Sequence, residues 1–177
     1  MNAVSIPQPR EREFLPEEFR ITVWAKLKPY YDNLLKRKIK SVDELERWIT
    51  DRDELEAIVT EEFSWRYIRI TRNSADQKAA DLYQYAVQEL APRVSSYSNR
   101  LNQKLVSCPF TRFLNPAKYN IFLRSTENAV DLFREENIPL TTEVQLKSKE
   151  YGRIFSEMTI GIDGLVSPCH RLVLPGL

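Results

Sequence analysis

The segment GIDGLVSPCHRL (161–172) contains two adjacent residues that could do chemistry, Cys169 and His170. His170 is the single histidine of the 177 residues, and Cys108 is the other cysteine. A catalytic zinc ion needs about three protein ligands. Adjacent side chains in a proline-flanked segment do not easily face one metal, nor do they form a positioned nucleophile and base. We therefore interpret Cys169 and His170 as parts of a solvated tail, and Cys108 as a small packing residue.

Two further patterns could support chemistry or binding. Adjacent glutamates occur at 61–62 and 135–136, but each pair lies among other charges, which favours a solvated helix face over acid–base catalysis. The segment SWRYIRITR (64–72) mixes aromatic residues with three arginines, a composition that suits single-stranded nucleic acid. The acidic stretch just before it offsets that positive charge. We predict no catalytic, cofactor-binding or metal site, and no nucleic-acid partner.

The composition is that of a soluble globular domain, with 42% hydrophobic and 29% charged residues and a net charge of +1. The two cysteines predict no disulfide framework. No apolar run of about 18 residues predicts a membrane span, and the first residues do not resemble a signal peptide. We expect a cytoplasmic protein without a membrane partner. Four glycines in the chain favour long helices over a fold rich in tight turns.

Helical spacing of apolar residues recurs along most of the chain. It predicts helices over 21–39, 41–49, 51–73, 75–91, 93–108, 116–136 and 141–157. The expected N-caps are Thr22, Ser41 (in a capping box with Glu44), Ser74 and Asn115. Prolines 29 and 92 predict a kink or a break. Trp48, Phe63 and Leu123 are expected to be buried on the apolar stripes of their helices.

Near the C-terminus the spacing of apolar residues changes from helical to alternating. The segment MTIGIDG (158–164) alternates apolar residues and predicts a strand with a turn at Asp163-Gly164. The following LVSPCHRLVLPGL lacks alternation, so we expect the strand to lack a good partner. The predicted organisation is an extended lead at 1–16, a helical domain at 17–164 and an irregular tail at 165–177. The fold class is therefore an all-α, antiparallel multi-helix domain with a β-strand or hairpin remnant near the C-terminus.

Several long segments are similar to those of a known family. They are FLPEEFRITVW, DRDELEAIVTEEFSWRYIRITR, SSYSNRLNQKLVSCPF and LRSTENAVDLFREENIPLTTEVQLKSKEYGRIFSEMTIGIDG. The marker residues in the last of these are Leu123-Arg124, Phe133–Leu140, Tyr151-Gly152, Met158–Ile160 and Asp163-Gly164. Over about residues 12–164 the chain resembles the N-terminal region of oligoendopeptidase F-type zinc metallopeptidases, which are thimet oligopeptidase-like enzymes.

The resemblance implies the helical, substrate-channel part of an enzyme that cleaves oligopeptides. In the full-length family zinc is bound in a later part, on an H-E-x-x-H helix with a downstream glutamate. Since the sequence contains no such motif, no catalytic or metal residue carries over, and this chain alone is expected to be inactive and to hold no cofactor. After Asp163-Gly164 the family has a polar second strand, from which this sequence departs. We expect an out-of-pattern tail, as after a frameshift or an altered gene end.

The partners that follow are an oligopeptide substrate in the parent family and self-association through apolar surface left exposed in this chain. The alternative function is a free-standing helical module that binds peptides or proteins. A third interpretation, an enzyme with an unrecognised site, has no supporting residue pattern.

Overall fold

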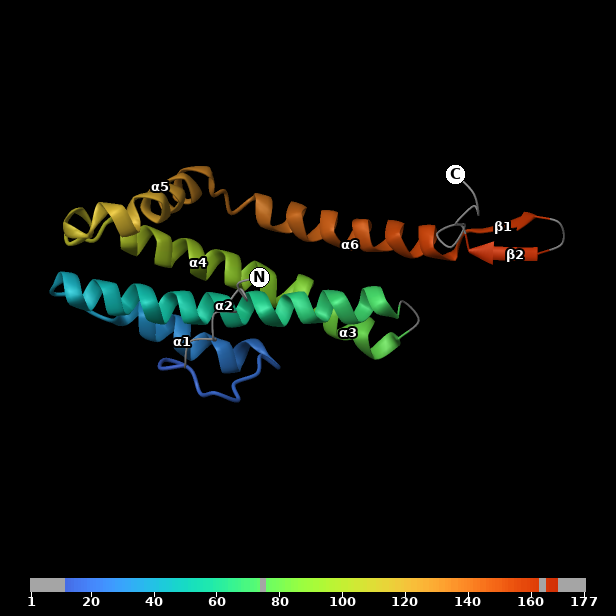
Figure 1. Ribbon diagram of the computed structural model, residues 1–177, viewed down its shortest axis with the longest axis horizontal. Helices are drawn as coiled ribbons and strands as arrows, with labels where there is room; N and C mark the ends of the chain where they lie inside the picture. Colours follow the sequence, from blue (N-terminus) through green and yellow to red (C-terminus); the bar gives the residue numbers. More distant parts are fainter. Residues whose placement is uncertain (1–11, 74–75, 163–164, 169–177) are drawn as a thin grey trace, which may run out of the picture. The chain divides into compact units, whose positions relative to one another are not determined.

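The computed structural model describes residues 12–73, 76–162 and 165–168, and almost all of this part is helical (Figure 1). The α-helices are α1 (Trp24–Lys36), α2 (Val42–Arg72), α3 (Gln77–Tyr85), α4 (Ala91–Val106), α5 (Pro116–Leu132) and α6 (Asn137–Glu157). A π-helical turn, η1 (Ala86–Leu90), joins α3 to α4, and a 3-10 turn, η2 (Thr111–Phe113), precedes α5. The prediction of an all-α fold is confirmed.

The helices group into two compact units. Unit 1 consists of the described residues up to Trp65 together with Ser96–Phe133. Unit 2 consists of Arg66–Ser95 and the described residues from Arg134 onward. The division between the units falls inside α2, inside α4, and in the connection between α5 and α6.

Helix α1 shows two departures from the expectation. It begins at Trp24 after Val23, which makes no side-chain cap, so Thr22 is not the N-cap. Pro29 lies inside α1 without ending it. A proline removes the hydrogen bond to the carbonyl four residues earlier and crowds that carbonyl. Here the carbonyl belongs to Ala25, near the start of the helix, where one lost bond is tolerated.

Helix α2 is one helix of 31 residues where the sequence predicts two. The expected break near Thr50 is absent, and the Thr50 hydroxyl donates to the Glu46 carbonyl at 3.1 Å, a bond that threonines inside helices make. The predicted cap is confirmed, since the Glu44 N–H donates to Ser41 Oγ at 3.2 Å. The Glu44 carboxylate accepts from the Lys40 N–H at 2.7 Å, one residue before the position of an ideal capping box.

The predicted interruption at Pro92 takes the form of a wider turn. In η1 the Ala91 N–H donates to the Ala86 carbonyl, one residue farther back than in an α-helix. Pro92 offers no N–H and would crowd the carbonyl four residues before it, and a π turn just ahead relieves that conflict without ending the helix. Ser74 lies outside the described residues, and α3 is capped by Asp76, whose carboxylate accepts from the Ala79 N–H at 3.0 Å.

The predicted start of α5 is confirmed, and that of α6 is wrong. Asn115 Oδ1 accepts from the Ala117 N–H at 3.0 Å, with Pro116 at the first helical position. Helix α5 ends at Leu132, earlier than predicted, and α6 begins at Asn137 instead of 141. Pro139 is accommodated because it lies in the first turn of α6, where its missing N–H has no intrahelical partner.

Two short strands follow α6. Strand β1 (Thr159–Ile162) pairs antiparallel with β2 (Leu165–Pro168), with Thr159 opposite Pro168 and Ile162 opposite Leu165. The sequence predicts a first strand without a good partner, and the structure instead pairs it with β2 over all four of its residues. Pro168 is tolerated because it stands at the end of the ladder, where a missing N–H costs little. The predicted turn at Asp163-Gly164 and residues 169–177 lie outside the described residues.

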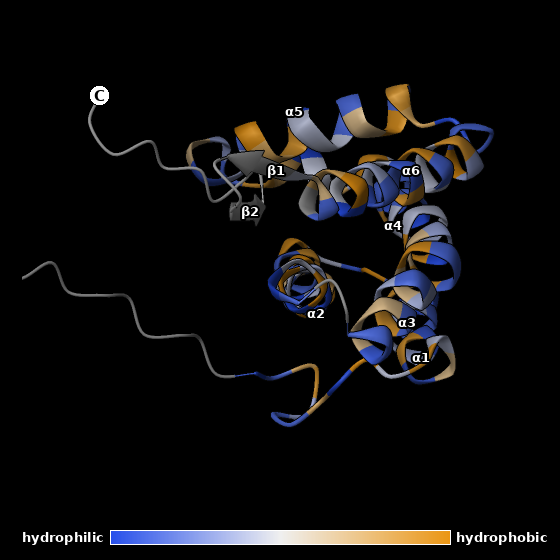
Figure 2. Ribbon diagram, turned by 90° about the vertical axis from the view of Figure 1, so that its right-hand side faces the viewer, coloured by the Kyte–Doolittle hydropathy of each residue, from blue (hydrophilic) through white to orange (hydrophobic). Residues whose placement is uncertain are grey.

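The core of unit 1 is centred on Trp48, which is fully buried as predicted. Its Nε1 donates to the Leu34 carbonyl at 3.0 Å and joins α2 to the end of α1. Phe63 and Leu123 are only half-buried, so those two predictions are wrong. Helix α5 buries only Tyr119 and Thr126, and its ribbon mixes hydrophobic and hydrophilic residues (Figure 2). The helix therefore packs on the core through a few residues, and Leu123 stays partly exposed.

Candidate functional site

The sequence-predicted chemistry does not assemble into a site. Cys169 and His170 lie outside the described residues. Within the described residues no group of three or more histidine, cysteine, aspartate or glutamate side chains is placed to hold a metal ion. Cys108 is half-buried and its thiol is free. The described residues therefore do not fit a zinc site, and we derive no zinc chemistry from them.

The adjacent glutamates have ordinary surface environments. Glu61 is mostly exposed, with Arg12 3.9 Å from its carboxylate, and Glu62 is half-buried. Glu135 and Glu136 are exposed just before α6. The interpretation as charged helix surface therefore fits Glu61, whereas Glu135 and Glu136 are exposed but lie in the turn before α6 and not on a helix.

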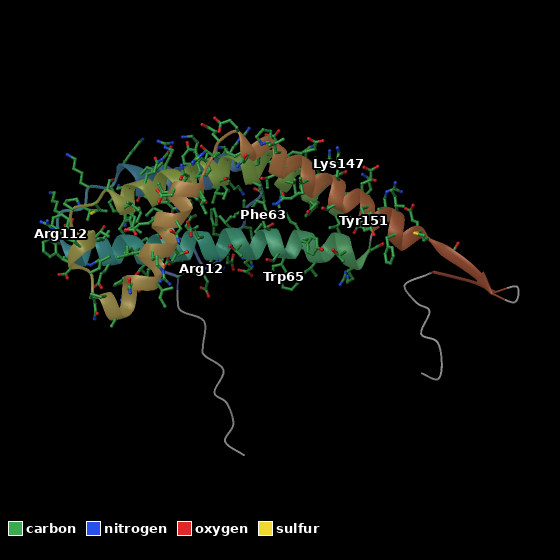
Figure 3. All side chains as sticks on the ribbon, turned by 90° about the horizontal axis from the view of Figure 1, so that it is seen from above. Arg12, Phe63, Trp65, Arg112, Lys147 and Tyr151 are labelled. Atoms are coloured by element: carbon green, nitrogen blue, oxygen red, sulfur yellow. The ribbon has the colours of Figure 1, made fainter. Side chains whose placement is uncertain are left out.

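The arginines of SWRYIRITR do not share one surface. Arg66 is buried, with 3% of its surface exposed, and its guanidinium donates to the Leu82 carbonyl at 3.1 Å. It therefore ties α2 to the end of α3 within unit 2, while Arg69 and Arg72 are exposed. Trp65 is half exposed and lies on the opposite side of α2 from Phe63 (Figure 3).

A pocket of about 460 Å³ in unit 1 is the best candidate for a binding site. It lies between the lead before α1, one face of α2 and the start of α5. Its apolar lining comes from Ile49, Ala57, Ile58 and Tyr119, and its charged lining from Arg12, Asp53, Glu54, Glu61 and Lys118. We call these residues the α2–α5 pocket. Its volume is in the usual range for small-ligand sites.

One wall of the α2–α5 pocket is fixed by Glu54. Its carboxylate accepts backbone N–H bonds from Glu13, Phe14 and Leu15, at 3.0, 3.2 and 2.8 Å. Leu15 is buried, so the lead is fastened to α2 by both hydrogen bonds and apolar packing. This contact positions Arg12, whose guanidinium donates to the carbonyls of Pro16 and Glu17.

Asp53 gives the pocket a distinct electrostatic character. It is open to solvent at the pocket mouth, yet the surrounding protein raises the pKa of its carboxyl by desolvation, with the Arg52 guanidinium opposing that shift. Lys118, on the α5 side, lies 3.8 Å from Glu46. The pocket thus carries charged groups of both signs, although its two cations, Arg12 and Lys118, also contact Glu61 and Glu46 of the protein. Its Thr50 hydroxyl is engaged with the Glu46 carbonyl, so the lining suits binding better than nucleophilic catalysis.

Behind the pocket, Arg52 holds the helices of unit 1 in place. Only 5% of its surface is exposed. Its Nη2 donates to Asn102 Oδ1 at 2.7 Å, its Nε donates to Glu56 at 3.2 Å, and its guanidinium lies 5.4 Å from the centre of the Phe122 ring. Arg52 therefore links α2 to α4 and α5, and so fixes the face of α2 that lines the pocket.

A second pocket, of about 450 Å³, is lined by Arg37, Lys38, Lys40 and Lys104 together with Ile39, Ser107, Cys108 and Pro109. Two of its cations are already engaged. Lys104 Nζ donates to the carbonyls of Leu34, Leu35 and Arg37, at 2.7, 2.9 and 2.5 Å, and Arg37 pairs with Asp51. Desolvation, helped by Arg37, lowers the pKa of Lys104. These contacts close the C-terminal end of α1 and give this pocket a structural role.

A family model for the Peptidase M3 N-terminal domain matches residues 14–133. The chain belongs to the Peptidase M3 N-terminal domain family. The matched segment contains all of the α2–α5 pocket except Arg12, and it includes every described helix before α6. No curated protein and no solved structure matches the chain. No helix within the described part of this M3 N-terminal domain is long and apolar enough to cross a membrane.

The sequence carries only a partial signal for the pocket. Thr50, Asp53, Ala57 and Glu61 follow one another at helical spacing on α2, so they could be assigned to one face once α2 is read as a single helix. Arg12 and Lys118 come from distant segments, and no local pattern marks them. The family match defines the domain but assigns no role to these residues.

Proposed function

We propose that this chain is the N-terminal, non-catalytic helical part of an oligoendopeptidase F-type zinc metallopeptidase, in which it forms a wall of the channel for an oligopeptide substrate. The match to the Peptidase M3 N-terminal domain over residues 14–133 is the observation that carries the proposal. Peptide hydrolysis and zinc binding then belong to a separate catalytic part, and the chain alone is inactive. The proposed compartment is the cytoplasm. The β1–β2 hairpin is the proposed remnant of the family's two strands.

The α2–α5 pocket supports a role in holding peptide. An extended oligopeptide presents a positive amine, apolar side chains and negatively polarised carbonyls, and the pocket presents Asp53, apolar residues and two cations to match. None of these groups needs to act on a scissile bond. The pocket is therefore suited to binding the part of a substrate that lies away from the reacting bond.

A chimeric enzyme tests the proposal. Residues 14–133 replace the corresponding domain of an active M3 peptidase, and zinc content and hydrolysis of a fluorogenic oligopeptide are measured. We expect one zinc per chain and retained hydrolysis, with Asp53→Asn and Lys118→Met each raising KM while kcat changes little. The matched control is Lys78→Met, on the exposed surface of α3. A folded, zinc-loaded chimera without peptidase activity contradicts the proposal.

The alternative is a free-standing module that binds peptides or proteins, which the separate packed core of unit 1 favours. Titration of the 177-residue chain with a fluorescent oligopeptide separates the two functions. The module is supported if the chain binds the oligopeptide with micromolar affinity, if Asp53→Asn loses this binding, and if the chimera is inactive. In either case the chain alone is expected not to hydrolyse peptide or retain zinc after dialysis.

A further inference from the structure

Helix α6 has two faces of different character, and it lies outside the segment matched to the M3 family. Its inner face packs on η1 within unit 2. The half-buried residues on this face are Ile138, Thr142, Leu146 and Lys149, and the ammonium of Lys149 lies 5.4 Å from the centre of the Tyr83 ring. Because this face is already packed against the protein, the opposite face of α6 needs its own explanation.

That opposite face is apolar and exposed. Its hydrophobic residues are Leu140, Val144, Tyr151, Ile154, Phe155 and, just beyond the helix, Met158, and we call them the α6 stripe. Each has between 47% and 71% of its surface exposed. Helical spacing places them in one narrow sector. An exposed apolar surface of this continuity marks an interaction site.

Four of the six residues of the α6 stripe are symmetric in their spacing. Leu140, Val144, Tyr151 and Phe155 are separated by four, seven and four residues, and the centre of this pattern lies between positions 147 and 148. If a second α6 packs antiparallel across a two-fold axis at that centre, Leu140 faces Phe155 of the other copy, and Val144 faces Tyr151. Each large aromatic side chain then meets a smaller aliphatic one, which is the complementarity that a two-fold interface requires.

The charges of α6 favour the same arrangement. Lys147 lies one turn before Tyr151, so helical spacing places it beside the stripe, and both residues are labelled on α6 in Figure 3. Lys147 pairs with Glu143 at 2.7 Å. Glu150 is exposed, and its negative charge acts on Lys147 of the same helix. In the antiparallel pair, Lys147 lies about 3 Å along the axis from Glu150 of the other copy, at 1.5 Å per residue. A parallel pair instead places Lys147 opposite Lys147.

We propose that the α6 stripe is a homodimer interface in which two copies of α6 pack antiparallel about an axis between Lys147 and Ser148. Apolar burial of the stripe drives association, while the two Lys147–Glu150 contacts set the direction and register. The proposal is independent of peptide binding, since the α2–α5 pocket lies in unit 1 and α6 in unit 2.

Sedimentation equilibrium of the 177-residue chain gives the first test. We expect a dimer at micromolar concentration and at least a tenfold higher dissociation constant for Val144→Ser or Tyr151→Ser. Ile121→Ser is the matched control, because Ile121 is a 75% exposed residue of α5, and it should leave the dimer unchanged. All three positions are exposed, so circular dichroism should show unaltered helix content. A monomer at every concentration, or equal weakening by the control, contradicts the proposal.

Charge reversal tests the direction. Lys147→Glu alone brings glutamate against Glu150 of the other copy, and Glu150→Lys alone brings lysine against Lys147, so each variant should dimerise at least tenfold more weakly. The double variant K147E/E150K should recover the affinity, because the pair is restored in reverse.

Cysteine cross-linking tests the register, in a chain whose Cys108 and Cys169 are replaced by serine. A mixture of Val144→Cys and Tyr151→Cys chains should give a disulfide-linked heterodimer under mild oxidation, while neither variant alone cross-links. Cross-linking of each variant with itself indicates a parallel pair and contradicts the proposal. Failure of the double charge variant to recover contradicts it as well.

Discussion

Arg52 Nη2 donates to Asn102 Oδ1 at 2.7 Å inside the core of unit 1, and this contact joins the middle of α2 to α4. The two residues lie 50 positions apart in the chain. The same guanidinium also contacts Glu56 and Phe122, so one side chain connects three helices. Since α2 lines the α2–α5 pocket, the position of that pocket depends on this buried contact.

We predict that Arg52→Ala lowers the free energy of unfolding of the chain by about 3 kcal/mol, because it removes buried hydrogen bonds and leaves Asn102 Oδ1 without its partner. Urea denaturation followed by circular dichroism measures the change. The double variant R52M/N102L should be more stable than Arg52→Ala, since it removes both polar partners and refills the space. A loss below about 0.5 kcal/mol for Arg52→Ala, the size of an ordinary surface change, contradicts the assignment.

The buried phenol of Tyr31 should make the free energy of unfolding depend on pH in the alkaline range. Burial raises the pKa of its phenol to about 12 from the usual 10. Below pH 10 the phenol is neutral in both the folded and the unfolded chain, so the contribution of Tyr31 to stability is fully present there. Between pH 10 and 12 the unfolded chain releases the proton first, and the free energy of unfolding should fall by about 1.4 kcal/mol per pH unit. Urea unfolding at several pH values measures this slope. The free energy of unfolding of Tyr31→Phe should fall less steeply with pH, by the same amount. Equal slopes for the two proteins refute the prediction.

Local chemistry explains which parts of this fold are predictable from sequence. Ser41 and Asn115 cap their helices as expected because a cap joins residues only two or three positions apart. Trp48 is predictable from the spacing of its neighbours. The contacts of Glu54 and Lys104 cannot be predicted from the sequence, because their backbone partners lie about 40 and 70 positions away. No helical period carries that information.

The candidate site divides in the same way. The face of α2 in the pocket follows from helical spacing, whereas Arg12 and Lys118 reach it only through the tertiary fold. The exposed stripe of α6 illustrates a different limit. Its periodicity predicts an apolar face, as it does for a core helix, and sequence spacing alone does not distinguish burial inside the chain from burial in an assembly.

Gly152→Ala should stabilise α6. Gly152 lies inside the helix, and a methyl group built there meets no atom within 4 Å. Alanine is favoured over glycine in a helix interior by about 0.5–1 kcal/mol, because glycine loses more backbone entropy on folding. Circular dichroism during thermal unfolding should show a higher midpoint at a fixed chain concentration. An unchanged or lower midpoint indicates that α6 does not form as described or that position 152 is covered in solution.

Glu54→Ala should release the lead from α2. The carboxylate of Glu54 accepts N–H bonds from three consecutive residues, Glu13, Phe14 and Leu15. Alanine leaves these donors without that acceptor, and hydrogen bonds to a charged group contribute about 1.5–3 kcal/mol each at most sites, less where water replaces the lost partner. We expect a loss of about 2 kcal/mol in the free energy of unfolding and faster tryptic cleavage after Arg12 and Arg20. Glu61→Ala is the control, because its exposed pair with Arg12 contributes at most about 1 kcal/mol. If both variants resist trypsin equally, apolar packing of Leu15 alone fastens the lead, and Glu54 does not position Arg12 in the pocket.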